Sequence, residues 1–150
     1  MQIYFTEKDV TSDVEAIKIA GNKLLEKDCV LEGFIQECVD REGPYPTGLV
    51  LPNGKAVAMP HGDSSYVKED SISIVRSNVP IIFKRMEDAT QNAECNLVFN
   101  LALSSGGKHI QVLRNLMGLF QGDMFINNCV NYDGDKLVDY VGKLLEEKSK

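Results

Sequence analysis

The two histidines of the chain, His61 and His109, each stand beside glycine where an apolar segment ends. His61 lies in the Met-Pro-His-Gly run at 59–62, and His109 closes the Gly-Gly-Lys-His run at 106–109. A neutral imidazole, with a pKa of about 6.5, is a nucleophile near neutral pH and can accept and pass on a phosphoryl group. The missing side chain of a glycine lets a phosphate approach the backbone closely. This pattern favours phosphoryl transfer, with a histidine that only closes a turn as the structural alternative at each position.

Phosphoryl transfer also needs positive charge and oriented N–H donors around the phosphoryl oxygens, because positioning and electrostatics lower most of the barrier. Arg41 offers the charge, and the backbone N–H of Gly62 offers a donor beside His61. His109 offers a second imidazole in the first turn of a helix that follows a Gly-rich strand exit, and the N-terminus of such a helix favours anions. We therefore expect one phosphoryl site built from His61, His109 and Arg41.

Helical periodicity and capping residues predict the helices that position these groups. Ser12 starts a capping box, so that a first helix follows it and ends near Asp28. The apolar stripe over 34–39 predicts a second helix, which Gly43 ends, so that Arg41 lies in its last turn. Further helical segments are expected at 110–120, 125–126 and 137–145.

Five apolar segments have the length and pattern of strands. A turn of Asn53 and Gly54 joins the first two as a hairpin. The segment from Leu97 to Leu103 is apolar except for Asn100, as expected of a central strand that is covered on both faces. The five segments are 49–51, 56–59, 71–74, 79–83 and 97–103. We therefore expect the α/β fold class, with residues 1–150 as a single domain that has a mixed sheet of about five strands and helices on both faces.

Charge and length exclude several classes of protein. Sixteen Lys and Arg residues against 22 Asp and Glu residues give a net charge of −6, which is the wrong sign for binding nucleic-acid backbones or anionic membranes. The longest apolar run, 97–103, is far shorter than the ~18 residues of a transmembrane helix. Residues 1–7 lack the basic start and apolar core of a secretory signal, so that a cytoplasmic protein is expected. No C-x-x-C pair is present, and we expect reduced, buried thiols and no metal site at Cys29, Cys38, Cys95 and Cys129.

These residues resemble a known family. Arg41 and Glu42, followed by Thr47 and by residues 56–62, resemble the phosphohistidine motif of the enzyme IIA components of the bacterial sugar phosphotransferase system, in the mannitol and fructose class. Residues 108–113 are similar to the second-histidine helix of that family. The Tyr-Pro-Thr-Gly-Leu run at 45–49, with a hairpin longer than the commoner pattern, resembles the galactitol-type subgroup. The likeness covers nearly the whole chain.

The resemblance implies a phosphotransferase component with a phosphohistidine intermediate. His61 would accept the phosphoryl group from the phosphocarrier HPr and pass it to a cysteine of a IIB component. His109 and Arg41 would stabilise the phosphoryl oxygens without carrying the group. Neither a metal nor an organic cofactor is implied, and the membrane component IIC would be served only indirectly. The process supported would be the uptake and phosphorylation of a sugar or sugar alcohol, of the galactitol kind.

Two other interpretations stay open at this point. A regulatory paralogue, similar to the nitrogen-related IIA proteins, would use the same His61 chemistry to control a partner protein. A non-catalytic binding module would use the histidines only structurally and would never form phosphohistidine.

Overall fold

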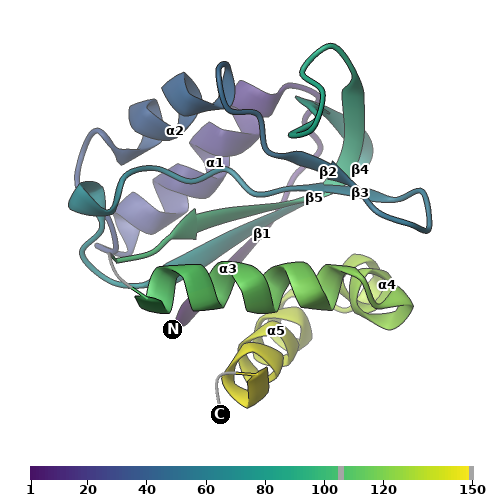
Figure 1. Cartoon of the computed structure of the whole chain (residues 1–150). Coiled ribbons are helices and arrows are strands. Elements are labelled where there is room, and N and C mark those ends of the chain that lie inside the picture. The colour runs from purple at the N-terminus through teal and green to yellow at the C-terminus, as the bar shows by residue number, and fades with distance from the viewer. Residues whose placement is uncertain (105–106, 149–150) are drawn as a thin grey trace.

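A five-stranded mixed sheet runs through the molecule and carries helices on both of its faces (Figure 1). The computed structural model describes residues 1–104 and 107–148, with residues 107–109 as backbone only. The strands are β1 (Gln2–Glu7), β2 (Gly48–Val50), β3 (Ala56–Ala58), β4 (Ser71–Lys84) and β5 (Asn92–Ala102). The helices are α1 (Asp13–Glu26), α2 (Phe34–Glu42), α3 (Gly107–Phe120), α4 (Asp123–Asn131) and α5 (Gly134–Lys148), with a short 3₁₀ helix η1 (Ser64–Tyr66). The expected fold class is confirmed.

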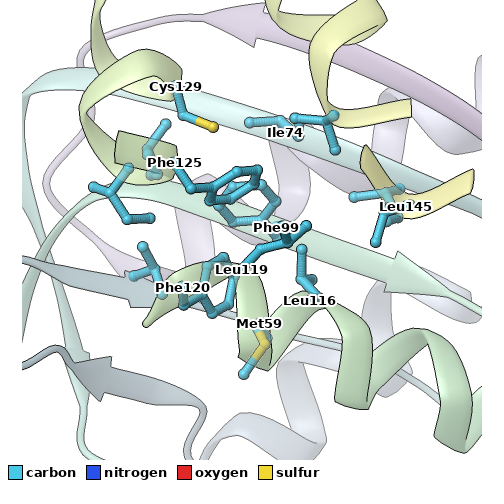
Figure 2. Close-up of a cluster of buried hydrophobic side chains, with 14 of the residues drawn as sticks. Met59, Ile74, Phe99, Leu116, Leu119, Phe120, Phe125, Cys129 and Leu145 are labelled. Atoms are coloured by element: carbon cyan, nitrogen blue, oxygen red, sulfur yellow. The ribbon is translucent and has the colours of Figure 1, made fainter. Parts of the chain in front are cut away.

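Two hydrophobic cores hold the layers together. Helices α1 and α2 cover one face of the sheet, and α3, α4 and α5 cover the other (Figure 1). On the second face Phe99 of β5 packs against Phe120 of α3 and Phe125 of α4, with ring centroids 5.1 and 6.3 Å away (Figure 2). Aromatic rings bury large apolar areas and favour such tilted or offset contacts. The three-helix layer is therefore fixed to the central strand by aromatic packing.

The start of α1 and the end of α2 lie where local chemistry predicts. The Ser12 hydroxyl accepts a hydrogen bond from the backbone N–H of Glu15 at 3.1 Å, which caps α1. Helix α2 ends at Glu42 with Gly43 as its C-cap, so Arg41 lies in its last turn as expected. Helix α4 is longer than the short helical piece predicted at 125–126. Asparagines interrupt the apolar periodicity of that segment in the sequence. Three apolar positions of the helix are nevertheless buried on one face.

The predicted strands at 71–74 and 79–83 are wrong as separate elements, because both belong to the single strand β4. Pairing with β5 shifts between Arg76 and Ile81 and then resumes at Cys95, so the exposed residues 78–80 form an irregularity inside one strand. Strand β1 was not predicted, and it pairs parallel to β4 at the edge of the sheet. One missed strand and one strand counted twice thus left the expected total of five correct.

The strand order places the region after β3 beside the end of β5. The order is β1-β4-β5-β3-β2, and β3 runs parallel to β5, so both strands end at the same edge of the sheet. His61 pairs with Leu101 as an isolated bridge just beyond β3. Helix α3 starts at Gly107, a few residues after β5. Ligands of open sheets with parallel strands commonly bind outside the carboxyl ends of those strands, which makes this edge the place to look for a site.

The burial expected of the four cysteines is confirmed. All four cysteines are buried and none forms a disulfide. No helix in the described part of the chain combines the length and the hydropathy needed to cross a bilayer.

Candidate active site

The imidazole of His61 is held by the backbone two residues before it. Its Nδ1 lies 2.9 Å from the carbonyl oxygen of Met59, and the side chain is half-buried. A carbonyl oxygen only accepts hydrogen bonds, so Nδ1 must carry the proton in the neutral ring. The lone pair of the neutral ring is then on Nε2. The hydrogen bond thus selects the tautomer whose Nε2 is the nucleophilic atom.

Two donors fix the peptide group that precedes His61. The Pro60 carbonyl accepts one hydrogen bond from the Leu101 N–H at 2.9 Å and another from the Asn100 side-chain amide at 2.8 Å. Asn100 is fully buried on β5. Sequence reasoning missed this residue as part of the site. The signal was present, since Asn100 is the polar exception within the apolar run of the central strand.

Helix α2 packs against the loop that carries His61 and Gly62. A Cβ atom on Gly62 would lie 3.0 Å from Glu37 Cγ, 3.3 Å from Phe34 and 3.4 Å from the Cys38 sulfur. A side chain at position 62 would therefore crowd α2, because the helix and the loop are in contact. Burial raises the pKa of the Cys38 thiol to about 12, so Cys38 is a neutral packing group and not a nucleophile.

Arg41 lies on the same side of the molecule as the His61 loop. Its guanidinium is 3.8 Å from the Glu37 carboxylate and 6.0 Å from the centre of the Tyr45 ring. The pKa of Asp63, two residues after His61, is lowered mainly by hydrogen bonds from Ser65 and in smaller part by the charge of Arg41. The structure therefore brings the predicted cation within electrostatic reach of the loop that carries His61.

A buried carboxylate joins the end of α2 to the hairpin. Glu42 accepts hydrogen bonds from the backbone N–H of Thr47 at 2.7 Å and from its hydroxyl at 2.9 Å. Burial raises the Glu42 pKa to about 7, and the bonds from Thr47 oppose this rise. The Thr47 carbonyl in turn accepts from the N–H of Met59 at 3.4 Å. Glu42 and Thr47 thus connect Arg41's helix to the residue whose carbonyl orients His61.

His109 lies in the first turn of α3 by its backbone. Its side chain, and residues 105–106 of the glycine loop expected to bind an anion, lie outside the described residues. The expected participation of His109 remains a prediction from the sequence. The described groups are a half-buried imidazole that carries its proton on Nδ1, an arginine whose charge acts on Asp63 in the following loop, and a helix that begins a few residues after β5. Such a combination is suited to accepting a phosphoryl group.

The chain is similar to known proteins of one family over most of its length. The family model described as phosphoenolpyruvate-dependent sugar phosphotransferase system, EIIA 2, matches residues 2–141. The galactitol-specific EIIA component of Escherichia coli (strain K12) is 26% identical over 129 residues, which cover 86% of this chain and 85% of that protein. The mannitol-specific phosphotransferase enzyme IIA component of Bacillus subtilis (strain 168) is 29% identical over 110 residues, which cover 71% of this chain and 69% of that protein.

Solved structures give the same result. The crystal structure of the mannitol IIA of Escherichia coli superposes with a TM-score of 0.71 at 26% identity and covers 96% of this chain and 95% of that one. The Escherichia coli complex of mannitol enzyme IIA with phosphorylated mannitol enzyme IIB gives 0.73 at 25% identity, with 97% of this chain and 94% of that one covered. The resemblance stated from the sequence motifs is confirmed.

Proposed function

Because this chain belongs to the EIIA 2 family of the phosphoenolpyruvate-dependent sugar phosphotransferase system, we propose that it is a phosphoryl carrier that uses His61. The observation that supports His61 most directly is the 2.9 Å contact between its Nδ1 and the Met59 carbonyl. That contact leaves the lone pair of the neutral ring on Nε2, which is the atom that attacks phosphorus.

The proposed cycle moves one phosphoryl group in two steps. Nε2 of His61 attacks the phosphorus of phospho-HPr, so that the bond to HPr breaks and its electron pair stays with HPr. While Nδ1 keeps its proton on the Met59 carbonyl, the phosphorylated ring is positively charged and is a good leaving group. A cysteine thiolate of a IIB component then attacks the phosphorus, and the electron pair of the P–Nε2 bond returns to the His61 ring.

Arg41 and His109 are proposed to stabilise the phosphoryl oxygens during both steps. For Arg41 the support is its position in the last turn of α2 and the effect of its charge on Asp63. For His109 the support is its place in the first turn of α3, close to the end of β5 where His61 is paired. The cycle as proposed uses no metal and no organic cofactor.

The physiological role that we propose is support of sugar or sugar-alcohol uptake through a IIB and a IIC component. Relatives are specific for galactitol and mannitol, and the mannitol IIA of Escherichia coli was solved with phosphorylated IIB. We propose a galactitol-like substrate for the pathway, a IIB cysteine as acceptor, and a cytoplasmic location shared with HPr. The IIA domain itself does not meet the sugar in this scheme.

The first test is phosphorylation by phosphoenolpyruvate, enzyme I and HPr, followed by intact mass. We expect one acid-labile phosphoryl group on the wild type and on His109→Ala, with slower labelling of the latter, and none on His61→Ala. Arg41→Gln should slow labelling, whereas Lys143→Gln, at an exposed lysine of α5, should not. A wild type that stays unlabelled while a known IIA component is modified would refute the carrier function and favour a binding module.

Transfer onward separates transport from regulation. Labelled protein is mixed with a galactitol-type IIB component and with its cysteine-to-serine variant, and the mass of each is followed. Loss of the group from His61 and its gain by the IIB cysteine supports the transport role. Retention on His61 in the presence of several IIB components would instead favour the regulatory paralogue.

A further inference from the structure

The central strand β5 carries a buried polar side chain at Asn100. The residue is fully buried, and its side-chain oxygen Oδ1 has no hydrogen-bond partner among residues 1–104 and 107–148. A buried polar atom without a partner lowers the stability of the fold. An apolar residue would suit this central strand better, so the position of Asn100 calls for a reason other than stability.

The orientation of the Asn100 amide follows from its neighbour. The Pro60 carbonyl only accepts hydrogen bonds, so the NH₂ group of the amide must face it, and it does so at 2.8 Å. The oxygen is then turned away and is left without a partner. A second contact of the same NH₂ group, 3.6 Å from the Cys38 sulfur, is weak by comparison. The unpaired oxygen is thus the consequence of directing a donor at Pro60.

Two donors on one carbonyl restrict the peptide group that leads into His61. The Leu101 N–H approaches the Pro60 oxygen from the sheet edge at 2.9 Å, and Asn100 supplies the second donor. Because the peptide bond is planar, fixing its oxygen also fixes the direction of the His61 N–H and Cα. The ring is at the same time held at Nδ1 by the carbonyl of Met59, on the other side of Pro60. Both constraints act within three consecutive residues.

We propose that Asn100 is a positioning residue for phosphoryl transfer: by fixing the Pro60–His61 peptide, it keeps the His61 ring in the Nδ1–H tautomer with Nε2 oriented for attack. This inference rests on the proposed function for its kinetic part only. The orientation and tautomer of the ring are properties of the unphosphorylated protein.

Ser73 provides a matched control. It lies directly opposite Asn100 in the register between β4 and β5, is fully buried, and also has a side-chain oxygen without a partner among the described residues. Its hydroxyl makes no hydrogen bond to Pro60 or His61 in the described part of the chain. Ser73→Ala therefore removes a buried polar atom from the same place in the sheet without removing a donor to the His61 loop.

The experiment compares wild type, Asn100→Val, Asn100→Ala and Ser73→Ala by three measurements. These are the initial rate of labelling at limiting phospho-HPr, the ¹⁵N chemical shifts of the imidazole nitrogens, and the midpoint of thermal unfolding. The signals of His61 are assigned by their absence in His61→Ala. For Asn100→Val we expect labelling about tenfold slower, because a misplacement of about 1 Å can cost about a hundredfold and the Leu101 N–H still holds the Pro60 carbonyl. We also expect His61 shifts that move toward a mixture of tautomers, and an unfolding midpoint that is not lowered. Ser73→Ala should match the wild type in rate and in shifts.

The outcomes separate positioning from a structural role and from failure of the proposed function. Wild-type labelling rates in both Asn100 variants would overturn the proposal, whether or not the unfolding midpoint falls. Unchanged ring shifts in both variants would overturn it as well. If Asn100→Val does not fold, Asn100→Ala decides, because it adds no bulk. If the wild type itself is never labelled, the carrier function is refuted, and the ring shifts alone still decide whether Asn100 orients His61.

Discussion

At the scale of single residues, the polar groups around His61 act through backbone carbonyls. Met59 accepts from the His61 ring, and Pro60 accepts from Asn100. Glu42 acts one step further away, through Thr47. Each of these hydrogen bonds restrains the direction of the carbonyl that accepts it. The His61 loop is therefore held by buried groups of α2 and β5 as well as by its own backbone.

The buried carboxylate of Glu42 predicts a pH dependence of stability. Its pKa is raised from 4.5 to about 7 in the folded protein, so unfolding releases a proton between these two values. The contribution of Glu42 to the free energy of unfolding is therefore greatest below pH 4.5. It falls as the pH rises to about 7 and does not change above that pH. The full difference corresponds to about 3 kcal/mol. In Glu42→Gln the amide oxygen still accepts from the Thr47 N–H and the NH₂ group donates to the Thr47 hydroxyl oxygen, so this variant should remove most of the fall.

Urea unfolding at pH 5 and pH 8 measures the effect. The wild type should lose more free energy of unfolding between these pH values than Glu42→Gln does. Glu94→Gln, at an exposed position of β5, serves as the control and should keep the wild-type difference. The same pH difference in Glu42→Gln and in the wild type would show that Glu42 titrates normally.

At the scale of elements, the contact between α2 and the His61 loop predicts the effect of a single methyl group. Gly62→Ala would place a Cβ atom 3.0 Å from Glu37 Cγ and 3.3 Å from the buried Phe34. Overpacking of this kind costs typically 1–3 kcal/mol, and here it also displaces the residue beside His61, so we expect about 1–2 kcal/mol of lost stability and slower labelling.

Gly43→Ala is the matched control at the end of the same helix. No atom lies within 4 Å of a Cβ placed on Gly43, and its backbone is already in the right-handed helical region. This variant should be unchanged or more stable by about 0.4–1 kcal/mol. Chemical denaturation of both variants checks the pair, and equal stabilities would mean that α2 yields easily to the added methyl group.

At the scale of the whole molecule, Arg76 links elements that are far apart in the sequence. From β4 it donates to the carbonyls of Cys129 and Tyr132 at the junction of α4 and α5, and it pairs with Glu7 of β1 at 3.0 Å. Its guanidinium also lies 4.7 Å from the centre of the Phe5 ring. One side chain thus joins the centre of the sheet, its edge strand and the helices of the second face.

Replacement of this arginine should destabilise the whole fold. Arg76→Met keeps the apolar stem but leaves two carbonyls without their donor, and we expect a loss of about 2–4 kcal/mol. Lys143→Met removes an exposed pair with Asp139 on α5 and should change stability by less than about 1 kcal/mol. Guanidinium chloride unfolding of both variants provides the comparison. Similar losses in the two would contradict the linking role of Arg76.

Local patterns in the sequence determined the features that depend on neighbouring residues. The cap at Ser12, the end of α2 at Gly43 and the hairpin turn around Gly54 follow from side chains and backbone freedom within a few positions. His61 was identified in the same way, because the glycine and the strand end that expose it are adjacent in the chain. The family resemblance rested on the motifs around Arg41, His61 and His109, and the comparisons confirm it.

Only the tertiary structure decided what depends on pairing across long separations. The edge strand β1 and the continuity of β4 are fixed by partners about 70 and 20 residues away, which no local pattern specifies. The same holds for Asn100, whose amide reaches Pro60 across 40 positions, and for Glu42, whose pKa depends on burial. Sequence therefore determined which residue could carry the chemistry. The tertiary structure decided which buried groups lie against the His61 loop. These groups are far apart in the sequence, and the strand order and the packing of α2 bring them together.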